Sequence, residues 1–276
     1  MTILQSIILG IIQGLTEFLP ISSSAHLVIT PYILGWTIPA QEGFTFDVLV
    51  QLGTLVAVIA YFRHDLWSIL RAVFVGIANK RPFSEPMARL GWLLVLATLP
   101  AIIAGFFFKD LVEQAFGSPL AAALFLLVTA ALLVVAERIG HRTRQMEAVN
   151  WKDALIVGLF QAISLLPGVS RSGATISGGM IRDLDRPTAA RFSFLMAVPV
   201  FLGAGVLAIV DLVKLPNAFV QVPTLVAGFI TSMVVGYLSI RWLLGYLAKR
   251  SLYSFAIYCV ALCLLVIAVT ALRAWL

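Results

Sequence analysis

Apolar residues form long runs along most of the chain, and short polar segments separate these runs. Six runs are long enough for a transmembrane helix, which takes roughly 17 to 25 residues. They cover residues 46–62, 90–108, 119–137, 189–211, 222–247 and 252–274. Two further regions are broken: residues 1–35 divide into 1–19 and 24–35, and Pro167-Gly168 interrupts residues 153–180. The pattern predicts six transmembrane helices and two re-entrant helical hairpins.

The composition supports the membrane interpretation. Hydrophobic residues make up 61% of the 276 residues, and charged residues only 12%. A soluble domain of this length cannot bury that much apolar surface, whereas a polytopic membrane protein requires it. We therefore predict an all-α polytopic membrane protein, with residues 1–276 forming a single integral membrane domain.

The 19 Lys and Arg residues divide unevenly between the two sides of this topology. If both broken regions re-enter, 15 lie on one side, 3 on the other, and Arg171 lies within the membrane. The positive-inside rule makes the richer side cytoplasmic, with a loop at residues 63–89 and both termini outside. This placement accounts for the net charge of +6, so no nucleic-acid partner is expected. The 15 are Arg63, Arg71, Lys80, Arg81, Arg89, Arg138, Arg142, Arg144, Lys152, Arg182, Arg186, Arg191, Arg241, Lys249 and Arg250.

The two broken regions resemble each other. GIIQGLTEFLPISSSA (residues 10–25) aligns with GLFQAISLLPGVSRSGA (residues 158–174) with one single-residue gap. On the predicted topology the two hairpins enter from opposite sides, which makes them an inverted repeat. Such repeats place a polar site near the membrane midplane, where the broken helices meet. Chance similarity between apolar, Gly-rich strings is the alternative. The alignment pairs Gly10 with Gly158, Gln13 with Gln161, Ser22 with Ser170 and Ser24 with Ser172.

The first break, QGLTEFLPISSSAH at residues 13–26, combines groups suited to nucleophilic chemistry. Gln13 and Glu17 lie four residues apart and share one face of a helix. A charge at the membrane centre costs about 3 kcal/mol, so it is rarely present there without a function. Ser23 and His26, three residues apart, would share a face of the next helix and supply a nucleophile and a base. The break also contains the hydroxyls of Ser22 and Ser24.

The second break, PGVSRSGAT at residues 167–175, has the features of a phosphate-binding turn. A helix that begins after a Gly-rich turn directs free N–H groups and its positive dipole end toward the tip. Arg171 adds a planar guanidinium that matches phosphate oxygens. Together the two tips could surround one phosphorus atom. The expected phosphate-binding residues are Ser22, Ser24, Ser170, Ser172, Gly173 and Thr175.

Other interpretations of these residues stay open. Ser24 and Ser172 could simply hydrogen-bond within or between helices. Glu17 and Arg171 could form a structural buried ion pair. Asp47 could cap a helix or bind a ligand. A Gln13–Glu17 face could also hold a transported cation, as in a secondary transporter.

The strings QGLTEFLPISSSAH (13–26) and LLPGVSRSGATISGG (165–179) resemble the two signature regions of the undecaprenyl-diphosphate phosphatase family, the bacitracin-resistance membrane phosphatases of bacteria. The resemblance covers essentially the whole chain. It implies hydrolysis of undecaprenyl diphosphate to the monophosphate carrier lipid used in peptidoglycan synthesis. It also implies a divalent cation, Mg²⁺ or Ca²⁺, and a site that faces the periplasmic side of the bacterial inner membrane.

By position, the resemblance assigns catalytic roles to Glu17, Ser23 (the nucleophile), His26 and Arg171. It places the acidic face, and with it the expected metal ligands, at Gln13 and Glu17. Gln13 is a departure, because many members have Glu there, which weakens the case for a metal site with two carboxylates. Ala25 is a second departure, at a position where Gly is common.

The expected mechanism is attack of Ser23 on the terminal phosphorus, with Glu17 or His26 accepting its proton. Arg171 and the helix N-terminus stabilise the phosphoryl oxygens, and water then hydrolyses the phosphoserine. Attack by His26 is an alternative that the sequence leaves open. A lipid-phosphate flippase or a secondary transporter could use the same inverted repeat. A homodimer stays open as well.

Overall fold

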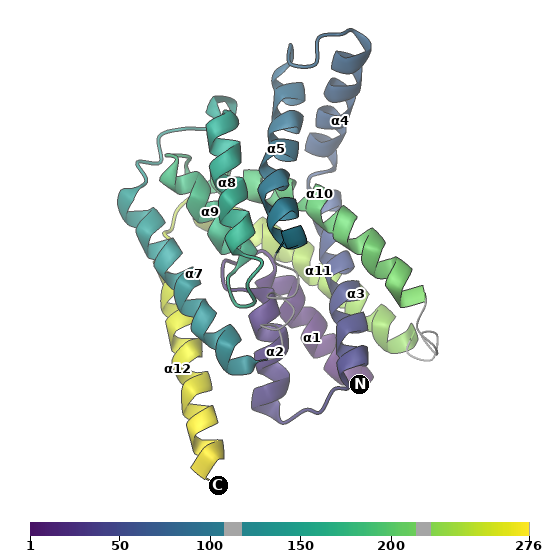
Figure 1. Ribbon diagram of the computed structural model, residues 1–276, viewed down its shortest axis with the longest axis vertical. Coiled ribbons are helices and arrows are strands. Elements are labelled where there is room, and N and C mark those ends of the chain that lie inside the picture. Colours follow the sequence, from purple (N-terminus) through teal and green to yellow (C-terminus); the bar gives the residue numbers. More distant parts are fainter. Residues whose placement is uncertain (108–117, 214–221, 276) are drawn as a thin grey trace.

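The computed structural model describes residues 1–107, 118–213 and 222–275, and for residues 40, 41, 204 and 206–213 it describes the backbone alone. Within these ranges the chain forms helices and turns, with no strand, so the predicted all-α class is confirmed there. The α-helices are α1 (Ile3–Thr16), α2 (Ser23–Leu34), α3 (Ala40–Tyr61), α4 (Arg63–Ala78), α5 (Pro86–Phe107), α7 (Pro119–Ile139), α8 (Trp151–Ile163), α9 (Arg171–Ile181), α10 (Arg186–Val213), α11 (Val222–Leu247) and α12 (Tyr253–Trp275) (Figure 1).

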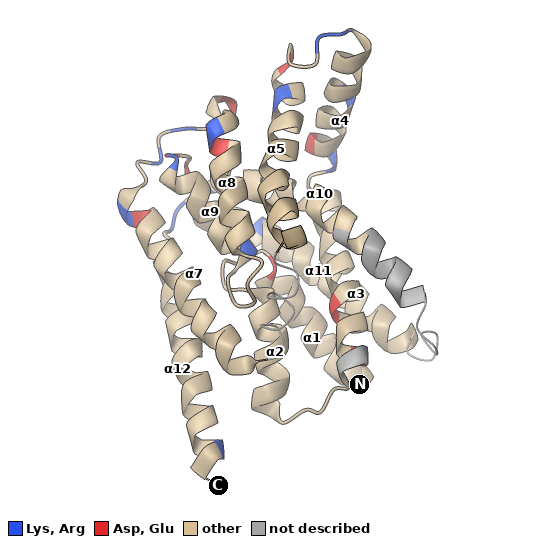
Figure 2. Cartoon of the chain, viewed as in Figure 1, with Lys and Arg blue, Asp and Glu red and all other residues tan. Residues whose placement is uncertain are grey.

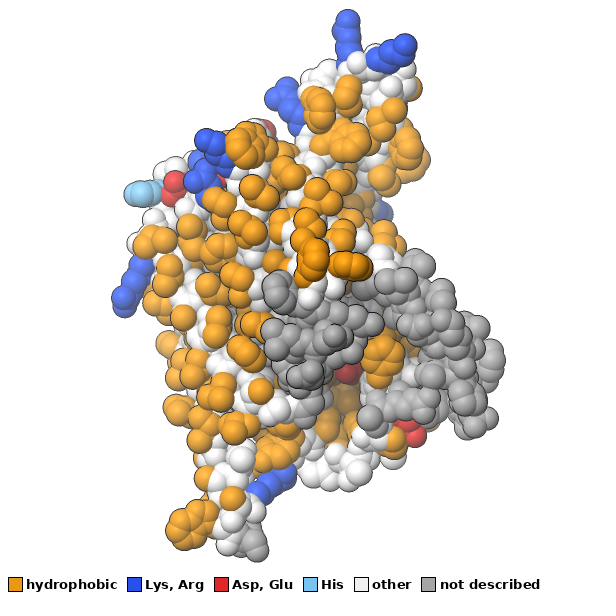
Figure 3. All heavy atoms as spheres, viewed as in Figure 1, with side chains coloured by type: hydrophobic (Ala, Val, Ile, Leu, Met, Phe, Trp, Pro, Cys, Tyr) orange, Lys and Arg blue, Asp and Glu red, His pale blue; other side chains and the backbone are white. Residues whose placement is uncertain are grey.

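Five helices of the described chain are long and apolar enough to cross a membrane. They are α3 from Glu42, α5, α7, α11 and α12. They cover five of the six predicted spans except for residues 62 and 252, just beyond helix ends, and residue 108, which lies outside the described residues. The sixth predicted span, residues 189–211, lies within α10, some of whose side chains fall outside the description. Hydrophobic side chains cover much of the described part of the face shown in Figure 3, as expected of a surface that faces lipid.

The prediction of a loop at residues 63–89 is wrong in part, because this stretch contains α4. The helix packs along α5, and the pair projects from one end of the molecule (Figure 1). Ile69 and Val73 of α4 would lie within 3 Å of a Cβ at Gly91 of α5, so only glycine permits this close packing. Basic residues interrupt the apolar pattern of the stretch, which therefore lacked the signal of a membrane span.

Both broken regions form hairpins of two short helices, α1 with α2 and α8 with α9. The two hairpins enter the molecule from opposite ends, and their turns meet in its interior (Figure 1). The amide of Gly168 in the second turn lies 3.5 Å from the hydroxyl of Ser24 in the first. Ser172 donates a hydrogen bond of 3.1 Å to the carbonyl oxygen of Leu19, so the two turns are joined directly.

Small residues allow the helices around the first hairpin to pack closely. A Cβ at Gly10 would lie 2.8 Å from the carbonyl oxygen of Gly228, and one at Gly14 would lie 2.8 Å from the amide nitrogen of Gly236. Small residues at such contacts let two membrane helices approach backbone to backbone. The glycines therefore let α1 pack directly against α11.

Lys and Arg gather at the end of the molecule where α4, α7, α8 and α9 have their outer ends, away from both termini (Figure 2). Asp153, whose side chain is fully buried there, accepts hydrogen bonds of 2.6 Å from Arg144 and 2.8 Å from Arg182. Burial would raise the pKa of Asp153, but the hydrogen bonds from Arg144, the Asn150 backbone and Arg182 hold it below its ordinary value. These ion pairs join α8 to the end of α9.

Candidate active site

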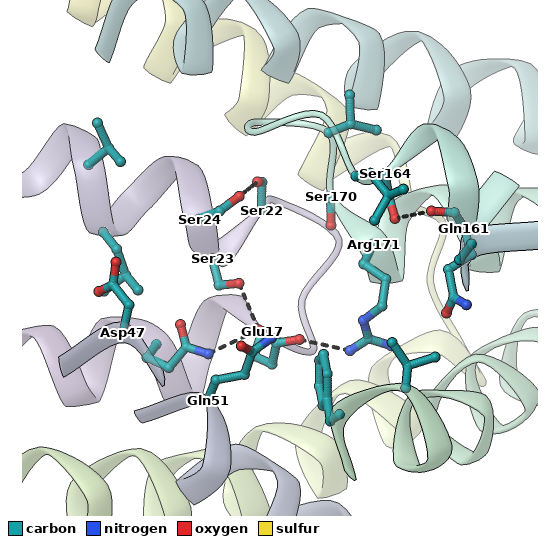
Figure 4. Close-up of a pocket in the computed structure, with 18 residues that line it drawn as sticks. Glu17, Ser22, Ser23, Ser24, Asp47, Gln51, Gln161, Ser164, Ser170 and Arg171 are labelled. Carbon is teal, nitrogen blue, oxygen red and sulfur yellow. Dashed lines mark hydrogen bonds and ion pairs between the residues drawn. The ribbon is translucent and has the colours of Figure 1, made fainter. Parts of the chain in front are cut away.

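A cavity of about 440 Å³ lies where the turns of the two hairpins meet. Its polar lining comes from both hairpins, at and beside their turns, and from α3 (Figure 4). Its apolar lining comes from α2, the second turn, α5 and α10. The polar residues are Gln13, Glu17, Ser22, Ser23, Ser24, Asp47, Gln51, Gln161, Ser164, Ser170 and Arg171, and the apolar ones are Leu27, Val28, Ala101, Leu165, Val169, Val200 and Phe201.

Glu17 is the centre of the polar lining. Its carboxylate oxygen Oε2 accepts hydrogen bonds from the Ser23 hydroxyl at 2.7 Å and the Gln13 amide at 3.0 Å. The other oxygen, Oε1, pairs with the Arg171 guanidinium at 2.8 Å. Glu17 ends α1, Ser23 begins α2 and Arg171 begins α9, so the geometry depends on both turns. Only 6% of the residue is exposed, so little water screens these interactions.

Arg171 is held on several sides while part of it stays free. Its Nη1 lies 3.4 Å from the carbonyl oxygen of Ser193, and its guanidinium carbon lies 4.8 Å from the centre of the Phe201 ring. Its Nε is buried and has no hydrogen-bond partner among the described residues. A donor left over in a polar cavity is suited to an anionic ligand, because an unsatisfied buried N–H is costly.

Two helix N-termini point toward the cavity, as the sequence predicted for the second of them. Ser22 precedes α2 with a left-handed φ of 70°, and its hydroxyl caps the Ala25 amide at 3.4 Å. Ser170 precedes α9, and its hydroxyl caps the Gly173 amide at 3.0 Å. Ser22 and Ser170 both line the cavity, so the positive dipole ends of two helices converge on one space.

Together these groups can carry out substitution at phosphorus. A hydroxyl that donates to a buried carboxylate is arranged for deprotonation as it attacks. A guanidinium and two helix N-termini beside it can bind the negative oxygens of a phosphate group. The Ser23–Glu17–Arg171 arrangement joins residues up to 154 positions apart in the chain.

Comparison with known proteins agrees with this chemistry. A model of the family described as Bacitracin resistance protein BacA matches residues 6–265. The chain belongs to this family. A protein named undecaprenyl-diphosphatase from Moorella thermoacetica is 45% identical over 273 residues, covering 99% of this chain and 100% of that protein. Proteins of the same name from Nocardioides sp. and Thermomicrobium roseum are 43% and 42% identical, covering 94% and 98% of this chain and 93% and 98% of those proteins.

Membership of the BacA family, together with the apolar helices, identifies a multi-pass membrane protein. Of the residues that the sequence assigned to phosphate binding, Ser22, Ser24 and Ser170 line the cavity. Three other expected residues do not line it. Ser172 donates to the Leu19 carbonyl, and the Gly173 amide donates to Ser170.

Thr175 is the third expected phosphate-binding residue outside the cavity. Its hydroxyl donates to the carbonyl oxygen of Arg171 at 2.7 Å and lies 2.6 Å from the hydroxyl of Ser193. All three groups therefore have protein partners that hold the second turn in place. Their expected role in phosphate binding therefore stays a prediction, because these three groups are bonded within the protein and do not line the cavity.

His26 is likewise absent from the cavity lining. Its Nδ1 lies 2.7 Å from the carbonyl oxygen of Ser22, and its Nε2 lies 2.8 Å from the hydroxyl of Tyr258 on α12. Its ring also stacks on Tyr258, with an angle of 7° between the planes. Both nitrogens are occupied, so the geometry favours Glu17 over His26 as the base and Ser23 over His26 as the nucleophile.

The predicted metal ligands offer oxygen atoms of the kind that Mg²⁺ and Ca²⁺ prefer. The Gln13 side-chain amide donates through its Nε2 to Glu17. The other end of the same amide, Gln13 Oε1, is buried and has no hydrogen-bond partner among the described residues. No group of three or more His, Cys, Asp or Glu side chains in the described chain could hold a metal ion alone. Gln13 and Glu17 therefore fit an ion that is also bound by a ligand's oxygens.

Four polar residues of the lining were missed by the sequence assignment or left undecided by it. Asp47 lies inside α3, away from its first turn, so it is a lining residue and does not cap the helix. Gln51 follows one helical turn later on the same face of α3 and also lines the cavity. Gln161 and Ser164 end α8. The repeat had already paired Gln161 with Gln13, and this was the available signal for it.

Proposed function

We propose that this protein hydrolyses undecaprenyl diphosphate to undecaprenyl phosphate and inorganic phosphate. The reaction recycles the carrier lipid for peptidoglycan synthesis and confers resistance to bacitracin. The observation that carries the proposal is the hydrogen bond of 2.7 Å from the Ser23 hydroxyl to Glu17, whose carboxylate also pairs with Arg171. Membership of the BacA family and the names of its relatives support the same substrate.

In the first step Ser23 Oγ attacks the terminal phosphorus as its proton passes to Glu17. The bond to the bridging oxygen breaks, the lipid monophosphate leaves as an anion on the side away from Ser23, and Glu17 then releases its proton to solvent. Arg171 and the N-termini of α2 and α9 stabilise the equatorial oxygens. In the second step Glu17 accepts a proton from the water that attacks the phosphoserine, and this proton restores the Ser23 hydroxyl. The sum is one diphosphate and one water converted to a monophosphate and phosphate, with one proton released to solvent.

A divalent cation, Mg²⁺ or Ca²⁺, is part of this proposal. Gln13 Oε1 and the Glu17 carboxylate would hold it together with oxygens of the diphosphate, as hard cations are usually bound in phosphoryl-transfer sites. When bound, the ion neutralises phosphate charge. Ser23 and Arg171 keep the roles described above.

The proposal includes six transmembrane helices, with α10 as the sixth, and two re-entrant hairpins in an inverted repeat. The protein would lie in the bacterial inner membrane with its site open to the periplasm. Apolar lining from α5 and α10, including Ala101 and Phe201, supports a path by which the prenyl chain leaves sideways into lipid. The gathering of Lys and Arg at the end opposite the termini supports the orientation.

Cysteine labelling of intact cells tests this orientation. Lys80→Cys is expected to stay unmodified by a membrane-impermeant thiol reagent, because the turn after α4 would be cytoplasmic. Thr37→Cys, in the exposed turn between α2 and α3 at the opposite end, is the matched control and should be modified. Cys259 and Cys263 are buried, so the wild type should give little background. Ready modification at residue 80 and protection at residue 37 would contradict the proposed orientation and indicate the opposite one.

Phosphate release by the purified protein in detergent tests the function. We expect release of inorganic phosphate from a long-chain prenyl diphosphate, its loss with a chelator and its recovery with Mg²⁺ or Ca²⁺. Hydrolysis needs no gradient and no second compartment, whereas a flippase or secondary transporter needs a membrane to act across. No release by folded protein would refute the proposed function. Release that a chelator leaves unchanged would refute only the role of the cation.

A further inference from the structure

Gln161 is a buried amide that the hydrolytic mechanism above does not use. It lies in the last turn of α8, and only 2% of the residue is exposed. Neither Nε2 nor Oε1 of its side chain has a hydrogen-bond partner among the described residues. A buried amide without partners destabilises a protein, so its retention points to a ligand that is bound during function.

The inverted repeat explains why this amide has no partner. Gln13, its counterpart, is followed four residues later by Glu17 and donates to that carboxylate at 3.0 Å. Gln161 is followed four residues later by Leu165, which offers no acceptor. Gln161 and Leu165 both line the cavity. The second hairpin therefore presents an amide to the cavity where the first keeps its amide bonded to the catalytic base.

The position of Gln161 suggests which group it would bind. In the view of Figure 4, Arg171 lies between Glu17 and Gln161, and Ser23 lies on the Glu17 side. In an in-line displacement the leaving oxygen departs on the side away from the nucleophile. The lining residues beyond Arg171 therefore face the leaving group, which in a diphosphate is the inner phosphate.

The unsatisfied donors of the cavity support an anion at this place. Gln161 Nε2 and Arg171 Nε are the two buried side-chain nitrogens of the lining that have no acceptor among the described residues. Phosphate oxygens would supply acceptors to both, and a diphosphate carries enough oxygens to reach them together.

We propose that the Gln161 amide binds the inner phosphate, the one that stays on the lipid, and so selects diphosphates as substrates. This inference rests on the proposed function. The bound inner phosphate would be oriented with its bridging oxygen directed away from Ser23. Gln161 would thereby contribute to binding of both the diphosphate substrate and the monophosphate product.

The test is Gln161→Met, which keeps the volume of the side chain and removes its hydrogen-bonding groups. The value of kcat/KM for a long-chain prenyl diphosphate is expected to fall about ten- to a hundredfold, the effect of losing one hydrogen bond to a charged group. Inhibition by a prenyl monophosphate should weaken about tenfold or more, whereas inhibition by inorganic phosphate should change less than about twofold. The melting temperature in detergent should stay the same or rise, because an unpaired buried amide is removed.

Ser177→Ala is the matched control. Ser177 is buried in α9, its hydroxyl has no partner among the described residues, and it does not line the cavity. Removing that hydroxyl should leave kcat/KM and both inhibition constants unchanged. A second variant, Gln161→Glu, keeps the shape but adds negative charge, and it should lose more activity than Gln161→Met because it repels the inner phosphate.

The outcomes separate this inference from the proposed function. A wild type that releases no phosphate refutes the function itself. An active wild type with an equally active Gln161→Met refutes the inference alone, as does a loss of activity that accompanies a lower melting temperature in both Gln161 variants. Equal weakening of inhibition by the prenyl monophosphate and by inorganic phosphate also refutes the assignment to the inner phosphate.

Discussion

Glu17→Gln is expected to lower phosphate release by about a hundred- to ten-thousandfold, the usual contribution of a general base. The carboxylate accepts the Ser23 hydrogen bond at 2.7 Å and is the group placed to take that proton. Glutamine has nearly the same shape but cannot accept a proton from the attacking hydroxyl. The measurement is turnover of a long-chain prenyl diphosphate at saturating divalent cation, together with the melting temperature in detergent.

Gln13→Glu is the comparison for this result. It adds a carboxylate one helical turn before Glu17 and removes the amide that donates to Glu17 at 3.0 Å. We expect this variant to remain active with saturating Mg²⁺ or Ca²⁺, and to depend more strongly on the cation, because two adjacent carboxylates repel each other unless a cation lies between them. Near-normal turnover of folded Glu17→Gln would remove Glu17 from the mechanism.

Arg171→Lys is expected to lower turnover by about a hundredfold or more, similar to the loss of one preorganised transition-state donor. Arginine pairs with Glu17 at 2.8 Å, contacts Ser193 and Phe201, and still leaves Nε free for a phosphate oxygen. Lysine keeps the charge opposite Glu17, but it has no planar guanidinium with which to bind the carboxylate and the phosphate at once. The melting temperature of the variant should stay close to that of the wild type.

This experiment separates phosphate binding from the structural ion pair that the sequence left open. If the role of Arg171 were only to neutralise Glu17, lysine would preserve most of the turnover. Arg182→Lys is the matched control, because Arg182 pairs with the buried Asp153 at 2.8 Å away from the cavity. It should keep its turnover. An Arg171→Lys variant with wild-type turnover, or one that is inactive only because it unfolds, would contradict the proposed role.

Several features could be read from local sequence. The five membrane-length helices follow from long apolar runs with few charged residues, because a helix that crosses lipid must be mostly apolar. The two breaks follow from short apolar segments that end at Pro20 and at Pro167-Gly168. Glu17 and Arg171 were identifiable because a charge in such a segment is costly and is rarely kept without a function.

Local sequence did not show α4, because basic residues interrupt its apolar pattern. The helix is stabilised by packing against α5, a tertiary contact that local sequence does not reveal. It also did not show which polar side chains of a turn face the cavity. Ser170 and Arg171 line the cavity, but Ser172 and Thr175, one and four residues after Arg171, do not. Those two hydroxyls instead hold the turn, by contacts to Leu19 and to Ser193.

His26 and Gln161 show most clearly what only the tertiary structure decided. His26 was expected in the site because it lies three residues after Ser23, but Tyr258, 232 residues away, occupies its Nε2. Gln161 was visible only as the counterpart of Gln13, and its burial without a partner emerged when the second turn met the first. The sequence by itself determined the apolar spans, the two breaks and the charged residues within them, because these depend on the cost of polar groups in lipid. The tertiary structure decided which groups share a cavity, because helices far apart in the chain supply the partners that withdraw some polar side chains and leave others free.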